Sequence, residues 1–452
     1  MQWRNSHKRL KIFVGGATPY ADNRGVAAIF RGTLEFLRRT FCDYEVVITA
    51  WHTFPCDGRR YYNKIPTTKF QLIDDVKVTV VGVEAPDSPE IVDILVVIIR
   101  LASLLLIMIF LRLLSRLHIN LAPRISVINE ILAADIIVEL NFGDILTDAH
   151  YARTLWIFNI LRLAVLGLSK KPLYMFPQSI GPFKSMINRT LARIILNHAR
   201  IVAIRDKYSM VQFMNLGIRK DKIRFVPDTS FFSPMVSRSE ASKILRDEGF
   251  IEEYNRAMVG IVVSPKFFDF RDFHRTAVTL RRFVNAVDSL VKEFHAKVIF
   301  IPHDTSVHEN SLDCRQLSFL IKRMLKNEDY ATVLTKEYTV EELWGIIGLC
   351  DVIISMMTHP IIASLRAGVP SVAIAYSHKT LGVIEPFGVG EYVFDLETFL
   401  MNKGVKAVSE LLKQGDAIGQ RLKMRVQSAE AILAKFQQEF SKDVARFVQF
   451  SQ

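Results

Sequence analysis

Short apolar runs alternate with longer segments of helical periodicity along most of this chain. In the N-terminal half, the pattern predicts strands over residues 10–14, 45–50, 76–83, 136–140, 173–176 and 201–204, and an amphipathic helix over 26–39. In the C-terminal half it predicts strands over 259–263, 297–301, 351–354 and 371–375, followed by almost wholly helical sequence over 405–450. Such alternation is typical of parallel sheets covered by helices. We therefore predict an α/β protein.

The length of the chain predicts more than one domain. With 452 residues it exceeds the size at which a single hydrophobic core stops growing. The stretch 228–257 is charged and irregular, so we predict an N-terminal Rossmann-like domain over 1–235 and a C-terminal one over 236–452. We expect the helical segment 405–450 to pack back across the first domain. Two such domains with a cleft between them would be similar to GT-B glycosyltransferases.

The segment 91–117 departs from the soluble pattern because it is dense in Ile, Leu and Val. Its longest uncharged run, 101–111, is 11 residues, whereas a bilayer span needs about 20. Basic residues follow on its C-terminal side, as expected of a segment that rests on anionic headgroups. Three interpretations stay open: a buried helix or dimer interface, a peripheral or monotopic membrane attachment, and a transmembrane span, which the length favours least.

The amino-acid composition limits the classes of molecule that the protein is expected to bind. The net charge is +12, which attracts anionic substrates or membrane surfaces. Nucleic acid is disfavoured because no basic run interleaves with aromatic residues. The four cysteines lie far apart without a C-x-x-C pair, so neither a zinc site nor a disulfide framework is indicated. The polar N-terminus leads directly into the first strand, which argues against a signal peptide and for a cytoplasmic protein.

The residues around Ser355 have the layout of an anion site. The strand 351–354 ends in the turn 355–359, where a helix begins, and the next strand delivers Tyr376 and Lys379 to the same sheet edge. Ligands bind at this edge of open α/β sheets. A histidine, a lysine and backbone N–H groups at a helix N-terminus suit a small, multiply charged anion. The alternative is an ordinary βαβ unit with a loop histidine.

Five motifs, in order, resemble those of the polysaccharide pyruvyl transferase family. They are the loop at 23–29, the Gln-Ser-Ile-Gly-Pro-Phe segment within 176–183, the Arg-Asp motif within 203–209, Pro227-Asp228, and the strand-end segment 355–359 with its later Gly-Val-Pro and Tyr-x-x-Lys. Two positions depart from the family pattern. Met357 stands where the family has arginine, and Val26 stands where it usually has an acidic residue.

The resemblance implies transfer of pyruvate from phosphoenolpyruvate to two hydroxyls of a sugar, as a cyclic ketal. The acceptor would be a cell-surface polysaccharide or its lipid-linked precursor, and no metal or other cofactor is expected. The expected catalytic residues are His359 and Arg205. The expected donor-binding residues are Arg205, Ser355, Met357, His359, Tyr376 and Lys379. The expected acceptor-binding residues are Asn23, Gly25, Asn141, Asp144, Gln178 and Ser179. His303 and Asp304, which follow the predicted strand 297–301, are further candidates for the cleft.

Alternatives to these roles remain open. Arg205 could form a structural ion pair with Asp206 or a neighbour, His359 could be a helix-start histidine satisfied by backbone, and Asp144 could cap a helix. The protein could instead be a GT-B glycosyltransferase that holds the ribose of a sugar nucleotide through Glu385. It could also be a catalytically silent, glycan-binding member of the fold, which Met357 favours.

Overall fold

The chain forms two compact units. The computed structural model describes residues 8–17, 21–52, 68–73, 76–82, 90–119, 125–148, 153–250, 256–305, 313–375 and 378–448. Unit 1 comprises Met1–Ala21, Ile29–Phe232 and Ile432–Gln452, and unit 2 comprises Asp22–Ala28 and Ser233–Ala431. The main boundary, at 232/233, is close to the predicted 235/236. Two short segments, 22–28 and 432–452, belong to the unit opposite to the one in which the prediction placed them.

Unit 1 is built on an eight-stranded sheet in the order β3-β4-β2-β1-β5-β6-β7-β8. The strands are β1 (Lys8–Gly15), β2 (Tyr44–His52), β3 (Thr68–Ile73), β4 (Val76–Gly82), β5 (Ile136–Glu139), β6 (Leu173–Gln178), β7 (Ile201–Ile204) and β8 (Ile223–Phe225). All neighbouring pairs are parallel except β3 with β4. The central strands are buried on both faces, which explains their continuous apolar sequences.

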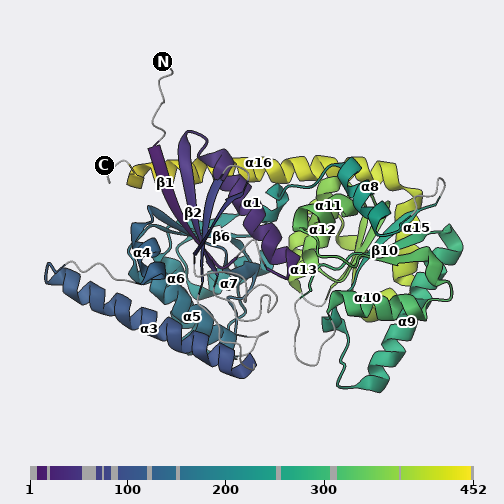
Figure 1. The fold of residues 1–452 in the computed structure, drawn as a ribbon, viewed down its shortest axis with the longest axis horizontal. Coiled ribbons are helices and arrows are strands. Elements are labelled where there is room, and N and C mark those ends of the chain that lie inside the picture. The colour runs from purple at the N-terminus through teal and green to yellow at the C-terminus, as the bar shows by residue number, and fades with distance from the viewer. Residues whose placement is uncertain are drawn as a thin grey trace, which may run out of the picture. The chain divides into compact units, whose positions relative to one another are not determined.

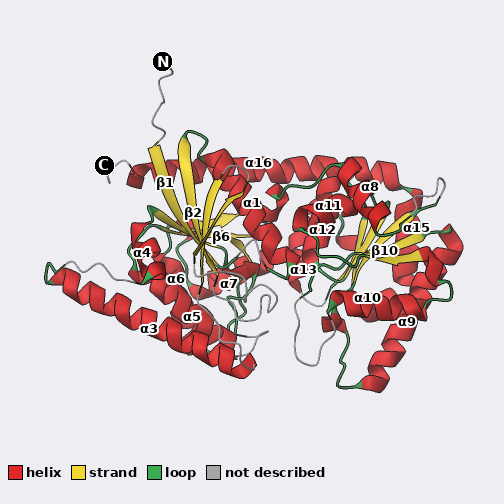
Figure 2. Ribbon diagram, in the orientation of Figure 1, coloured by secondary structure: helices red, strands yellow, loops and turns green. Residues whose placement is uncertain are grey.

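Helices cover both faces of this sheet (Figures 1 and 2). They are α1 (Arg24–Thr40), α3 (Glu90–Arg116), α4 (Ser126–Ala133), α5 (Arg153–Leu168), α6 (Met186–His198) and α7 (Lys207–Leu216). The long helix α3 packs on α5, and α5 packs on α6. α3 therefore lies on the outside of the helical layer.

Unit 2 is built on a six-stranded sheet in the order β11-β10-β9-β12-β13-β14, with every neighbouring pair parallel. Its strands are β9 (Met258–Val262), β10 (Lys297–Phe300), β11 (Ala331–Val333), β12 (Val352–Ser355), β13 (Ser371–Ile374) and β14 (Val393–Phe394). Its helices are α8 (Arg238–Asp247), α9 (Phe273–Phe294), α10 (Cys314–Met324), α11 (Val340–Ile347), α12 (Thr358–Ala367), α13 (His378–Ile384), α14 (Leu396–Thr398), α15 (Gly404–Lys413) and the first part of α16 (Gly415–Val448).

The stretch predicted to be irregular contains a helix. α8 begins after Ser237, whose hydroxyl accepts a hydrogen bond from the Glu240 N–H, while the Glu240 carboxylate accepts one from the Ser237 N–H. This capping box starts a helix whose polar sequence gives only a weak apolar stripe, Ala241 and Leu245 being its buried members. The Ser-x-x-Glu capping pattern is present in the sequence. The prediction overlooked it because the many charged residues of this stretch are typical of irregular structure.

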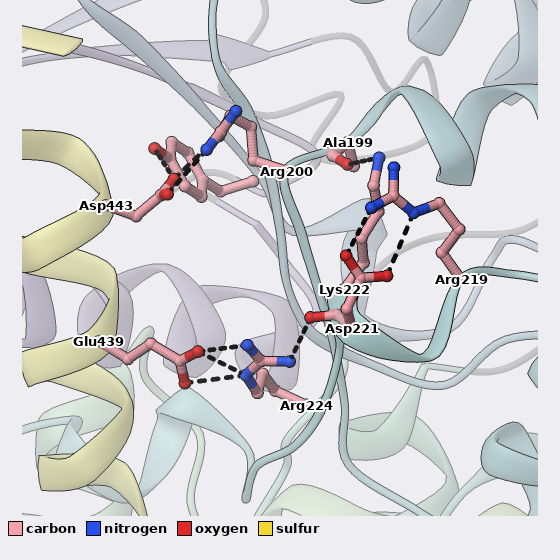
Figure 3. Close-up of polar contacts among 9 residues, drawn as sticks. Ala199, Arg200, Arg219, Asp221, Lys222, Arg224, Glu439 and Asp443 are labelled. Atoms are coloured by element: carbon pink, nitrogen blue, oxygen red, sulfur yellow. Dashed lines mark hydrogen bonds and ion pairs between the residues drawn. The ribbon is translucent and has the colours of Figure 1, made fainter. Parts of the chain in front are cut away.

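The end of α16 packs on the sheet of unit 1. Phe436 and Phe440 join a cluster of rings with Phe36 and Phe176, at centroid separations of 5.2 to 6.2 Å. Polar contacts flank the cluster (Figure 3): Asp443 accepts hydrogen bonds from the Tyr174 hydroxyl at 2.8 Å and from Arg200, and Glu439 accepts them from Arg224. The expectation that the segment 405–450 packs back on the first domain is therefore met only by its last part, since residues up to Ala431 belong to unit 2.

Helix α3 has two apolar stripes on opposite sides. Val97, Leu101, Leu104 and Met108 are buried. Leu95, Ile99, Leu106, Phe110, Leu113 and the following Leu117 are each more than half exposed. At 100° per residue the two sets lie about 180° apart. The interpretation of this segment as a buried helix is therefore wrong, because one whole side of the helix is exposed. Leu95–Arg116, with a mean hydropathy of 2.5, is the one described helix long and apolar enough to cross a membrane.

Candidate active site

The carboxyl end of β12 leads into a helix N-terminus in unit 2. Ser355 is buried, and its hydroxyl accepts a hydrogen bond from the Met357 N–H at 3.0 Å and donates one to the Met357 carbonyl at 2.8 Å. This closes the turn tightly before α12 begins at Thr358. Met357 is the N-cap of α12 and provides no side-chain cap. The first N–H groups of the helix therefore have no side-chain acceptor from the N-cap residue, which suits an incoming anion.

His359, in the first turn of α12, lies directly against Gly25. A Cβ added to Gly25 would be 2.4 Å from Nδ1 of His359 and 2.9 Å from its Cγ, so residue 25 has no space for a side chain. The Asn23 side chain holds this loop in place, because its amide donates to Asp304 at 2.9 Å and its oxygen accepts from the Gly25 N–H at 2.9 Å. The loop therefore forms part of the surroundings of His359.

His303 lies beneath the same loop. Its carbonyl accepts a hydrogen bond from the Arg24 N–H at 2.9 Å, and its fully buried ring accepts one at Nε2 from the Trp344 indole at 3.2 Å. Burial, together with the nearby His359 and Arg24, lowers the pKa of His303 well below its ordinary value. The ring is therefore neutral, and because Nε2 is the acceptor, Nδ1 carries the proton. Within the described residues, Nδ1 has no hydrogen-bond acceptor.

Arg24 brings a cation to this part of unit 2. It is only 7% exposed, and its Nη2 donates to Glu337 at 3.0 Å. Glu337 also accepts from Arg315 at 2.8 Å, so two arginines share one carboxylate. Arg315 pairs with Asp313 as well, so the cluster contains two arginines and two carboxylates. The sequence interpretation missed Arg24, although it lies within the Asn-x-Gly motif, because the motif specifies the residues on either side of it.

Arg205, at the end of β7 in unit 1, is engaged with its own neighbours. It is 7% exposed, its Nε donates to the Ser179 hydroxyl at 3.1 Å, and its Nη1 forms an ion pair with the buried Asp228. Burial lowers the pKa of Arg205, but Asp228 and Asp144 outweigh this effect and raise it. The guanidinium also lies against Gly143, where a Cβ would be 3.2 Å from Nη1. Arg205 thus joins three strand-end loops.

The neighbouring Asp206 does not pair with Arg205 in a hydrogen bond or ion pair. It caps α7 instead, by accepting hydrogen bonds from the N–H of Ser209 at 2.7 Å and from its hydroxyl at 2.8 Å. The Ser209 hydroxyl in turn accepts from the Ile180 N–H at 2.8 Å. The Arg-Asp-x-x-Ser motif therefore fixes the Gln-Ser-Ile-Gly loop to the start of α7.

Asn141 belongs to a buried polar network at the carboxyl ends of β1 and β5. Its side-chain oxygen accepts from Asn159 at 2.7 Å and from Arg162 at 3.3 Å, and Arg162 forms a fully buried ion pair with Glu139 at 2.5 Å. A Cβ on Gly16 would lie 2.3 Å from the backbone nitrogen of Asn141. The network lies where the strand order of the sheet changes direction, which is the usual ligand position in such sheets. Its charged pair had no signal in the sequence.

The structure separates the predicted site residues into two groups. Unit 1 contains Arg205, Asn141, Asp144, Gln178 and Ser179, and unit 2 contains Asn23, Gly25, Ser355, Met357 and His359. Asn23 and Gly25, predicted to lie with the acceptor residues of the first domain, thus lie with the predicted donor residues. The reason is the bridge between Asn23 and Asp304 and the contact of Gly25 with His359.

Two predicted donor residues are not described in full. Tyr376 lies outside the described residues, and Lys379 is in α13 without a described side chain. Among the described residues, no group of three His, Cys, Asp or Glu side chains is arranged to hold a metal ion.

Solved structures with the same fold include two that hold sugar nucleotides or their parts. UDP-GlcNAc 2-epimerase from Neisseria meningitidis, bound to UDP-GlcNAc, is 12% identical, with a TM-score of 0.54 over 94% of this chain and 99% of that one. Anabaena Alr3699/HepE, in complex with UDP and glucose, is 14% identical, with a TM-score of 0.54 over 96% and 100%. These likenesses confirm the predicted α/β fold of GT-B type.

Sequence comparison identifies the family. The amylovoran biosynthesis protein AmsJ of Erwinia amylovora is 22% identical over 281 residues, 61% of this chain and 66% of that protein, so the match spans slightly less than two thirds of this relative. The family model for polysaccharide pyruvyl transferase matches residues 23–378, which include both groups of site residues and all five motifs except the final Lys379. The chain therefore belongs to the polysaccharide pyruvyl transferase family.

Proposed function

We propose that this protein transfers the pyruvyl group of phosphoenolpyruvate to two hydroxyls of a sugar in a cell-surface polysaccharide or its lipid-linked precursor. The observation that carries the proposal is the cluster in unit 2 formed by His359, the Asn23–Gly25 loop and the N-terminus of α12. It combines an imidazole and helix N–H groups at the end of β12 with an arginine on the loop that contacts the imidazole. Such a cluster suits a donor that has both a carboxylate and a phosphate.

The reaction needs one proton transfer to carbon. Protonation of the methylene carbon of phosphoenolpyruvate makes its C2 electrophilic, the first hydroxyl adds to C2, and the second hydroxyl replaces the phosphate. One of the two hydroxyl protons balances the proton given to carbon, and the other leaves with the phosphate. His359 is the proposed proton donor, since an imidazole can give and take protons near neutral pH.

Arg24 is the proposed cation for the donor. The family places arginine at the position of Met357, and methionine has no charge with which to bind an anion. Arg24 lies in the same unit, beside His303 and on the loop that contacts His359. Arg24 and Arg315 share Glu337, and Arg315 also pairs with Asp313. In this proposal, Arg24 binds the donor anion in place of the arginine that the family has at position 357.

Arg205 has a different proposed role. Its Nε and Nη1 are used by Ser179 and Asp228, so the guanidinium already has a buried anionic partner. We assign to Arg205 the positioning of the unit 1 loops that contain Ser179 and Gly143. Asn141, Asp144, Gln178 and Ser179 remain the proposed acceptor residues, with Asp144 as a base toward one hydroxyl.

The test is incubation with phosphoenolpyruvate and candidate free or lipid-linked glycans. Phosphate release that depends on the glycan, together with a product heavier by one pyruvyl group and a ketal carbon signal in ¹³C NMR, is the expected result. His359→Asn should abolish this turnover with an unchanged melting temperature. Phosphate release without a ketal, or none with any glycan, would contradict the proposal.

A glycosyl transfer reaction is the second candidate, because the two solved structures described above hold UDP-GlcNAc or UDP and glucose. Glu385, the proposed ribose ligand for that reaction, is exposed at the end of α13. Binding of UDP, measured by calorimetry and lost in Glu385→Gln, would favour this candidate. Pyruvyl transfer predicts that phosphoenolpyruvate binds and that Glu385→Gln does not affect it.

A further inference from the structure

The outer face of unit 1, formed by α3 and α6, exposes large apolar side chains. The exposed stripe of α3 includes Leu106, Phe110, Leu113 and Leu117, and Met186 and Ile187 begin α6 with 72% of each residue exposed. α5 lies between these helices and packs on both (Figure 1). Soluble proteins rarely expose apolar surface of this extent without a partner. We call this surface the α3–α6 face.

The stretches of sequence that contain α3 and α6 are rich in basic residues. Residues 94–129 and 149–205 together have 13 Lys and Arg and no Asp or Glu, whereas the rest of the chain has 45 Lys and Arg against its 46 Asp and Glu. Arg116 lies at the C-terminal end of the exposed stripe, and Lys184 and Arg189 lie near Met186 and Ile187 in the sequence; all three are exposed. Arg162 and Arg205 are buried in ion pairs with Glu139 and Asp228, and Arg200 pairs with Asp443. The basic contribution of the face therefore depends on Arg116, Lys184 and Arg189.

The sheet topology shows that α3 does not cross a bilayer. β1 to β4 precede α3 and β5 to β8 follow it, yet β1 pairs with β5 along Ile12–Gly15 and Ile136–Glu139. A single crossing would place these two strands on opposite sides of the membrane. The 18 residues between Leu117 and Ile136 include α4, which packs on β1 and β4, so they cannot supply a second crossing. If α3 contacts a membrane, it therefore lies along the membrane surface.

We propose that the α3–α6 face docks on a bilayer that contains anionic lipids, with the exposed stripe of α3 in the interface. Aliphatic side chains between basic ones are the composition of interfacial helices. A second copy of the chain is a poorer partner, because a symmetric dimer through this face would bring two basic surfaces together. Nucleic acid is poorer still, because the exposed residues are mainly aliphatic and provide few stacking or hydrogen-bonding groups. Docking would place the enzyme beside acceptors that are attached to lipid.

Vesicle sedimentation of the full chain tests the apolar contribution. Wild type should pellet with phosphatidylcholine vesicles that contain about a third phosphatidylglycerol, and Leu106→Ser, Phe110→Ser and Leu113→Ser combined should weaken binding at least about tenfold. These side chains are exposed, so the variant should keep its melting temperature. A matched control in unit 2 replaces three equally exposed apolar residues, Phe273→Ser, Met401→Ser and Met424→Ser, and should bind as wild type does.

Charge reversal tests the basic contribution independently. Arg116→Glu, Lys184→Glu and Arg189→Glu combined should lower binding to anionic vesicles by about tenfold or more, and added salt should weaken wild type in the same direction. The control reverses three exposed basic residues of unit 2, namely Arg281→Glu, Arg323→Glu and Lys406→Glu. It should retain most of the binding.

The outcomes separate the bilayer from other partners. Equal loss in the test and control variants would show non-specific adsorption and overturn the assignment of the α3–α6 face. A wild-type chain that stays in the supernatant with anionic vesicles would also overturn it. So would a dimer, measured by sedimentation velocity, that the three serine substitutions dissociate, since the face would then belong to a second copy.

Discussion

The ring of His359 occupies the space in which a side chain of residue 25 would lie, with its Nδ1 2.4 Å from the position of a Cβ on Gly25. The two residues are separated by more than 300 positions in the sequence, yet they belong to the same unit. The glycine of the Asn-x-Gly motif and the histidine of the strand-end motif are therefore two halves of one arrangement. Glycine is required at position 25 by close approach.

Gly25→Ala should displace the His359 ring by about an ångström and lower kcat/KM for pyruvyl transfer by about 100-fold, because small errors in the placement of a proton donor are costly. The measurement is steady-state kinetics with phosphoenolpyruvate, with thermal unfolding on the same sample. Gly415→Ala is the matched control, since no atom lies within 4 Å of the added Cβ. Equal kinetics for the two alanine variants would show that the contact between residue 25 and His359 does not affect catalysis.

Arg24→Met should weaken binding of phosphoenolpyruvate by about tenfold or more, which corresponds to the loss of a charge-assisted contact of about 1.5–3 kcal/mol. Calorimetric titration with phosphoenolpyruvate measures it. Arg315→Met is the control, because Arg315 also pairs with Glu337. If Arg24 acts only through its ion pair with Glu337, the two substitutions will have the same effect.

A variant that moves the cation from position 24 to position 357 tests the proposed role of Arg24 more directly. In Arg24→Met, the second substitution Met357→Arg restores a cation at the position that the family uses, and donor affinity should recover by one order of magnitude or more. The same Met357→Arg change in the wild-type background should help less, since Arg24 is still present. An identical effect in both backgrounds would mean that the two positions do not replace each other.

Arg205→Ala should destabilise unit 1 as well as reduce turnover. Removing one partner of a buried ion pair leaves an uncompensated charge, which costs about 3–5 kcal/mol. Asp228 would be that charge, because it is buried and pairs with Arg205. Arg205→Met combined with Asp228→Asn should be milder, as it removes both charges. Urea unfolding measures both variants, and an Arg205→Ala protein as stable as wild type would contradict this account.

The sequence predicted most of the central strands and the family, for a physical reason. β5, β6, β7 and β12 are buried at every position and therefore appear as largely apolar runs. The strands that the pattern missed are short or lie at edges, such as β8, with its half-exposed residues, and β14, which has two residues. Such strands have too few buried positions to produce a recognisable hydrophobic pattern in the sequence.

The sequence predicted many of the individual residues of the candidate site, but it did not predict which of them lie together. Motifs identify Gly25 and His359 separately, and no local pattern shows that one packs on the other. Arg24 and Glu337 had no signal, because their pairing depends on how residues 22–28 fold against unit 2. The exposed stripe of α3 was also hidden, since a helix with two opposite apolar stripes has no single polar side to reveal its orientation.

The attachment of α16 to unit 1 should weaken in acid. Burial alone would raise the pKa of Asp443, but hydrogen bonds from Arg200 and Tyr174 outweigh it and the pKa is lowered. A carboxylate with a lowered pKa stabilises the folded state above its unfolded pKa, about 4, and this contribution is lost as the pH falls through the folded value. Asp443→Asn should therefore cost about 1–3 kcal/mol at pH 7, and the difference from wild type should shrink below about pH 4.

Unfolding by urea between pH 7 and 3, with hydrogen exchange of the amides in 432–448, measures this effect. Hydrogen exchange reports the local attachment, so the amides around Phe436 and Phe440 should lose protection in Asp443→Asn before the sheet strands do. Glu430→Gln is the matched control on the same helix, since the Glu430 side chain is exposed. A stability difference between wild type and Asp443→Asn that did not change from pH 7 to pH 3 would show that the carboxylate charge does not hold the helix, leaving the aromatic cluster as its anchor.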